Sequence, residues 1–139
     1  MSKIAITSRR GRIEVSLYES DAPAAVSHIL KLIDDRFYDG LVIHRVVRDA
    51  LTQTGCPNGD GSGDSGVFLP AEKTHHRLLT GSLALAKNED GVASSQFFMC
   101  WRPLPDLDGE YTVFGRITRG IDVLYRLREG DAIQSISRV

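Results

Sequence analysis

The stretch Leu41-Val42-Ile43-His44-Arg45-Val46-Val47 is rich in β-branched residues, and this composition predicts a β-strand. A shorter candidate strand follows at 51–54. Each candidate carries a polar side chain in apolar surroundings, Arg45 in the first and Gln53 in the second. Neighbouring strands with these two side chains on one side would place a guanidinium and an amide next to apolar surface. From the pattern alone, strand alternation favours an Arg45 side chain that points outward into solvent.

Toward the N-terminus, the sequence predicts a β-hairpin and then a helix. Apolar residues alternate with polar ones on both sides of the turn at 9–11, at Ile4, Ile6, Ile13, Val15 and Leu17. Apolar residues then recur at helical spacing over 23–34. Pro23 lies in the first turn of this predicted helix, and Asp21 is the candidate for its N-terminal cap.

Toward the C-terminus, further strands are predicted at 82–86, 95–101, 112–117 and 132–138. A second helix is predicted between Gly120 and Glu129, where apolar residues keep a three-residue spacing. The inventory is therefore about seven or eight short strands with a helix near each end of the chain. Antiparallel strands in this number commonly close into a barrel, and two helices can plug its ends.

Composition and charge restrict the class of protein. A chain of 139 residues with 42% hydrophobic content suits a single domain spanning 1–139. A net charge of -1 gives no electrostatic reason to expect a nucleic-acid partner. Because there is neither a signal-peptide pattern nor an apolar run of the ~20 residues that span a membrane, we expect a cytoplasmic protein without a membrane partner. Cys56 and Cys100 are expected to be free thiols.

Several motifs that would carry other chemistry are incomplete. The glycine-rich stretch 55–66 is followed by no Gly-Lys-Ser/Thr and lacks the acidic ligand of a calcium loop, so we interpret it as a surface loop. No histidine pairing has metal-ligand spacing among His28, His44, His75 and His76. No serine lies in a Gly-x-Ser-x-Gly elbow. We therefore expect no metal and no cofactor.

At the positions of the central strands, the sequence resembles the cyclophilin family, and the resemblance runs from Ile4 to Val139. It is specific because separated segments agree in order: 37–46, Gln53, 81–86 with 95–98, 107–117 and 130–136. The resemblance implies a mainly β fold, a closed eight-stranded antiparallel β-barrel capped by two α-helices. It also implies a peptidyl-prolyl cis-trans isomerase that needs no cofactor, with Arg45 as the catalytic residue facing the active groove.

The resemblance also implies the remaining site residues. The proline ring would be held by Leu51, Ala86, Phe98 and Leu107, and the peptide backbone would be bound by Gln53 and Gln96. The expected partners are proline-containing peptides and unfolded protein segments, and the expected state is a monomer.

The chain departs from the family pattern at four positions of the implied site. Ala50 replaces a large aromatic residue, Lys87 stands where asparagine is common, and Tyr111 stands where histidine is common. Asp106 occupies the place where many members carry a tryptophan that contacts cyclosporin, so we expect weak cyclosporin binding. Because Ala50 shrinks the pocket wall, the alternative function is a proline-peptide binding or chaperone module of the same fold with little turnover.

Overall fold

Eight β-strands and two α-helices make up the fold in the computed structural model, which describes residues 2–70, 72 and 74–139. The strands are β1 (Lys3–Ser8), β2 (Gly11–Leu17), β3 (Arg45–Val47), β4 (Leu51–Thr54), β5 (Ser82–Lys87), β6 (Ala93–Cys100), β7 (Val113–Arg119) and β8 (Ser135–Arg138). The helices are α1 (Pro23–Asp34) and α2 (Ile121–Arg126), with a 3-10 turn η1 (Pro105–Leu107). All strands join one antiparallel sheet in the order β3-β4-β6-β5-β7-β2-β1-β8. No described helix is long and apolar enough to cross a membrane.

The elements predicted from local pattern are confirmed where the pattern is strongest. Ile4 lies opposite Val15 and Ile6 opposite Ile13 in the β1–β2 hairpin, so its apolar residues share one face. Helix α1 has the predicted bounds, because its apolar spacing gives a continuous buried stripe. The predicted strand over 41–47 is shorter than expected, since only its last three residues form β3.

The prediction of a closed barrel is wrong: the sheet is a curled half-barrel whose end strands, β3 and β8, do not pair. Residues 40–43 and 130–133, which we call the seam, instead meet through a single bridge between Val42 and Ala132. Backbone bonds of the seam include Gly40 N to Ile133 O at 2.7 Å and Ile43 N to Asp131 O at 2.8 Å. These bonds occupy backbone groups that a longer β3 would need, which explains why that strand is short.

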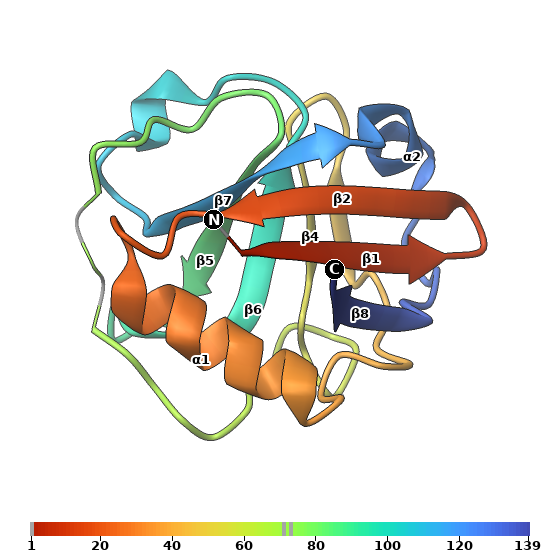
Figure 1. Cartoon of the computed structure of the whole chain (residues 1–139), viewed down its shortest axis with the longest axis horizontal. Helices are drawn as coiled ribbons and strands as arrows, with labels where there is room; N and C mark the ends of the chain where they lie inside the picture. The colour runs from red at the N-terminus through yellow and green to blue at the C-terminus, as the bar shows by residue number, and fades with distance from the viewer. Residues whose placement is uncertain (1, 71, 73) are drawn as a thin grey trace.

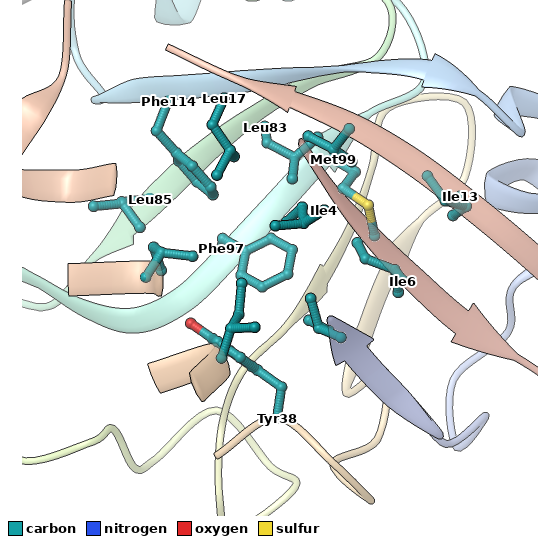
Figure 2. Packing of buried hydrophobic residues seen from close by; sticks show 14 of the residues in the cluster. Ile4, Ile6, Ile13, Leu17, Tyr38, Leu83, Leu85, Phe97, Met99 and Phe114 are labelled. Atoms are coloured by element: carbon teal, nitrogen blue, oxygen red, sulfur yellow. The ribbon is translucent and has the colours of Figure 1, made fainter. Parts of the chain in front are cut away.

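The two faces of the sheet serve different purposes, as alternation along β6 shows. Phe97 and Met99 point into the interior and pack with large aliphatic and aromatic side chains of the other strands (Figure 2). Phe98 and Cys100 belong to a second apolar cluster on the opposite face, which we call the outer cluster. Its buried members are Leu51, Leu78, Ala84, Phe98, Cys100, Leu104 and Val113. The interior is therefore a packed core, and the outer face is available for a site.

The helices lie at opposite ends of the curled sheet (Figure 1). Helix α1 contacts β8, and α2 contacts β2. With both helices at the ends, the outer face of β3, β4, β6 and β5 is covered by neither of them, and the candidate site lies there.

Candidate functional site

Three polar side chains form a hydrogen-bonded row across the outer face, which we call the polar row. Arg45 Nη1 donates to Gln53 Oε1 at 3.1 Å, and Gln53 Nε2 donates to Gln96 Oε1 at 3.0 Å. The sheet produces this row directly, because Arg45 lies opposite Gln53 on neighbouring strands and Gln53 lies opposite Phe98. Gln96 precedes Phe98 by two residues and therefore shares its face.

The glycine-rich stretch 55–66 is a loop, as predicted, and it is fastened to the polar row. Gln96 Nε2 donates to Gly61 O at 3.0 Å and to Gly63 O at 2.8 Å. The buried Cys56 sulfur accepts N–H bonds from the same two glycines. Burial opposes ionisation of this thiol, but the N–H groups of the loop outweigh it and lower the pKa of Cys56. The loop thus has a defined path beside the site.

A cavity of about 680 Å³ lies between this loop and the β5–β6 connection. Five of the predicted site residues line it: Arg45, Gln53, Ala86, Lys87 and Gln96. The lining also contains residues that sequence reasoning did not select, above all His44, Asp60, Asp64, Glu89 and Asp90. The turn signature at Asp90-Gly91 indicates a chain reversal, but nothing local indicates that this turn faces the glycine-rich loop.

The other predicted site residues lie in the outer cluster. Leu51 and Phe98 are buried there, and Ala50, Leu107 and Tyr111 are half-buried against them. The Phe98 and Tyr111 rings meet edge to face with centroids 5.2 Å apart.

Two of the predicted residues connect the outer cluster with the cavity. Ala86 packs against the cluster and also lines the cavity. Lys87 Nζ lies 4.8 Å from the centre of the Tyr111 ring. The predicted residues are therefore brought together as one polar and one apolar half of a continuous surface. Asp106 lies exposed in η1, immediately before Leu107.

Arg45 is exposed, as strand alternation predicts, and it also lines the cavity. An outward orientation therefore does not exclude the position beside a groove that the resemblance implies. The neighbouring residue His44 also lines the cavity. Burial lowers the pKa of His44, although the Gln96 side chain and the carboxylates of Asp60 and Asp64 act in the opposite direction. The imidazole is therefore neutral at pH 7, and Arg45 supplies the positive charge of this strand.

The chain belongs to the cyclophilin-type peptidyl-prolyl cis-trans isomerase family. The sequence pattern described as "Cyclophilin type peptidyl-prolyl cis-trans isomerase/CLD" matches residues 2–138.

Named relatives agree with this membership. The chain is 41% identical to a peptidyl-prolyl cis-trans isomerase of Helicobacter pylori, over 94% of this chain and 83% of that protein. It is 38% identical to a peptidyl-prolyl cis-trans isomerase of Synechococcus elongatus, over 100% of this chain and 97% of that protein.

A solved structure is similar over nearly the full chain. A cyclophilin-type peptidyl-prolyl cis-trans isomerase of Cryptosporidium parvum, crystallised in the presence of the dipeptide Ala-Pro, superposes with a TM-score of 0.88 at 25% identity. The match covers 97% of each chain.

Proposed function

We propose that this protein is a peptidyl-prolyl cis-trans isomerase that acts on X-Pro bonds of peptides and unfolded protein segments, with Arg45 as its catalytic residue. Family membership and the named activity of its relatives support the reaction. The Ala-Pro dipeptide of the Cryptosporidium parvum structure supports a proline-containing ligand. The observation that carries the proposal is the Arg45 guanidinium, hydrogen-bonded to Gln53, which itself lies opposite Phe98 of the outer cluster.

The difficulty of the reaction lies in amide resonance, which opposes rotation of an X-Pro bond with a barrier of ~18 to 20 kcal/mol. A catalyst must therefore bind the twisted amide better than either planar form. Twisting removes conjugation and leaves the proline nitrogen more basic. A fixed donor beside that nitrogen and the proline carbonyl is then most favourable at the transition state. Arginine suits this role because its planar fork stays charged at any physiological pH.

The hydrogen bonds of the polar row leave the two glutamines with different groups for binding a peptide. Gln96 uses both N–H groups on Gly61 and Gly63, so toward a peptide it can only accept a hydrogen bond. Gln53 uses one N–H group on Gln96 and retains the other as a donor. We assign Gln53 as donor and Gln96 as acceptor to the peptide backbone, while the outer cluster holds the proline ring. No proton transfer and no covalent intermediate are required.

The test is the substitution Arg45→Ala. We expect kcat/KM on a proline tetrapeptide to fall by about a hundredfold or more, the usual effect of removing one transition-state donor. The measurement is a protease-coupled isomerisation assay, with circular dichroism to show that the fold is intact. Arg48→Ala is the matched control, because Arg48 is an exposed arginine three positions away that does not line the cavity beside the polar row. Equal activity of wild type and Arg45→Ala would overturn the proposal.

The alternative is a proline-peptide binding or chaperone module with little turnover. It is favoured by Ala50, which leaves a small side chain at the edge of the outer cluster. This alternative predicts that a proline peptide binds to the wild type while neither wild type nor Arg45→Ala accelerates isomerisation. Nuclear magnetic resonance titration with the same tetrapeptide separates it from the enzyme.

A further inference from the structure

We propose that Cys56 is a positioning residue for the isomerase reaction: its sulfur holds the glycine-rich loop in the path that gives the amides of the polar row a single direction. The inference rests on the proposed function, and it adds to that function a residue that lies outside the cavity lining.

The polar row has one direction because its two ends differ in hydrogen-bonding character. Arg45, at one end, can only donate, so it requires the side-chain oxygen of Gln53. At the other end, the carbonyl groups of Gly61 and Gly63 can only accept, so they require the side-chain nitrogen of Gln96. The nitrogen of Gln53 then meets the oxygen of Gln96. A reversed Gln96 amide would turn its oxygen toward two carbonyl oxygens and its nitrogen toward another nitrogen.

This direction decides which group each glutamine offers to a peptide. In the proposed function, Gln53 donates to the peptide backbone and Gln96 accepts from it. An amide that alternates between two orientations would offer the wrong group part of the time and weaken the binding of the peptide. The loop carbonyls are therefore part of what prepares the site for its ligand.

The backbone that precedes Cys56 is fastened to the strand that carries Gln96. Ser95 Oγ of β6 donates to Gly55 O at 2.7 Å, and this bond is buried. Gly55 approaches the strand so closely that a Cβ atom there would lie 2.3 Å from Ser95 O. Cys56 follows directly and is buried, so its sulfur is a fixed point beside β6.

The sulfur connects this fixed point with the far side of the loop. It accepts the N–H groups of Gly61 at 3.2 Å and Gly63 at 3.3 Å, and the thiol donates to Asp60 Oδ1 at 3.7 Å. Because glycine adopts many backbone conformations, hydrogen bonds rather than steric limits must hold the path of the loop. Without an acceptor at position 56, the two N–H groups would turn toward water, and the carbonyl groups of the same residues would shift away from Gln96.

The test compares Cys56→Ala, which removes the acceptor, with Cys56→Ser, which keeps one. We expect Cys56→Ala to raise the KM for a proline tetrapeptide about tenfold, the effect of losing one hydrogen bond to the peptide. The effect on kcat should be smaller, because the bond from the peptide to Gln96 forms in both the ground state and the transition state. The KM of Cys56→Ser should lie closer to that of the wild type than to that of Cys56→Ala.

Nuclear magnetic resonance of the Gln96 side-chain amide provides a second readout that a general loss of stability would not mimic. In the wild type, both amide protons should exchange with water at least about tenfold more slowly than those of Gln134, which is exposed and makes no side-chain hydrogen bond within the described residues. Cys56→Ala should remove most of this difference, and Cys56→Ser should retain it. If Cys56→Ala does not fold, Cys56→Val and Cys56→Thr give the same comparison, because they differ in the hydroxyl acceptor at similar volume.

Glu72→Ala is the control for stability. Glu72 accepts N–H groups at the start of α1 and belongs neither to the cavity lining nor to the outer cluster, so this variant should keep the wild-type KM. A wild-type KM in folded Cys56→Ala, an equal rise of KM in Glu72→Ala, or fast exchange of the Gln96 amide in the wild type would overturn the inference. If the wild type does not accelerate isomerisation, the proposed function fails, and the dissociation constants of the tetrapeptide still decide the role of Cys56.

Discussion

The partner of Arg45 determines how its charge acts. Gln53 is a neutral amide, so it orients the guanidinium through one hydrogen bond and leaves its positive charge uncompensated. A carboxylate at that position would form an ion pair and reduce the field toward a bound peptide. An exposed arginine with an amide partner therefore combines a fixed direction with a full charge, both of which suit the proposed stabilisation of a twisted amide.

At the edge of the outer cluster, Ala50 contributes only a small, half-buried side chain. We expect Ala50→Phe or Ala50→Leu to raise kcat/KM on a proline tetrapeptide about tenfold, because additional buried apolar surface worth about 1.4 kcal/mol would hold the proline ring. The protease-coupled assay provides the measurement. The same substitutions in the Arg45→Ala background should leave activity low. Unchanged or lower activity in two folded Ala50 variants would show that the pocket is already complete.

Pattern reasoning selected the strands that carry Arg45 and Gln53 and singled out these two side chains, and the resemblance implied the roles of Arg45, Gln53 and Gln96. The hydrogen bonds that connect these side chains with one another and with the loop could not be predicted from the sequence. Gln96 donates both of its N–H groups to the glycine-rich loop. These bonds depend on the path of the loop, and no local sequence pattern predicts that path. The catalytic role of Arg45 stays a prediction.

Helix α1 begins with a cap from a distant part of the chain. Ala22 occupies the N-cap position and makes no side-chain bond. The carboxylate of Glu72 instead accepts the N–H groups of Ala24 at 3.2 Å and Ala25 at 2.7 Å. Asp21, the predicted cap, pairs with His76 at 2.6 Å, so that prediction is wrong. Local spacing was sufficient for the bounds of the helix, but a cap supplied by a residue 48 positions away has no signature near Pro23.

Removal of the distant cap should destabilise the protein. Glu72→Ala is expected to lower the free energy of unfolding by about 1 kcal/mol, the usual cost of losing an N-terminal cap. Urea denaturation followed by circular dichroism measures the change. Glu110→Ala is the control, since Glu110 is exposed and makes no side-chain hydrogen bond within the described residues. Equal stability of the Glu72→Ala and Glu110→Ala variants would contradict the capping role.

At the scale of the whole molecule, Asp131 ties the seam to the β1–β2 turn. Its buried carboxylate accepts hydrogen bonds from Arg10 Nε at 3.0 Å and from the Arg128 backbone at 2.8 Å. Arg9 Nη2 lies 3.4 Å away. The hydrogen bond from Arg10 is the main reason that the pKa of Asp131 lies below its ordinary value of 3.8.

This carboxylate should make stability depend on acidity. A pKa that is lower in the folded than in the unfolded state contributes stability above the unfolded value, and the contribution is lost as the pH falls through the folded value. We expect Asp131→Asn to cost about 2 kcal/mol at pH 7. Below about pH 4, the difference between wild type and variant should shrink.

Urea denaturation between pH 2 and pH 7 tests this expectation. Asp122→Asn serves as the control, because that carboxylate is 71% exposed and pairs only across one helical turn, where a bridge contributes little. A difference between wild type and Asp131→Asn that does not vary with pH would refute the role of the ionised carboxylate.

Alternate residues of β6 lie on opposite faces of the sheet. Phe97 and Met99 fill the interior, whereas Gln96 and Phe98 face the outer side, where we propose that the peptide binds. Evolution can consequently retune what this chain recognises at every second residue while the intervening residues preserve the scaffold. A substitution on the outer side of β6 can therefore change the surface offered to a ligand without altering the side chains of the interior, because the two sets lie on opposite sides of the same backbone.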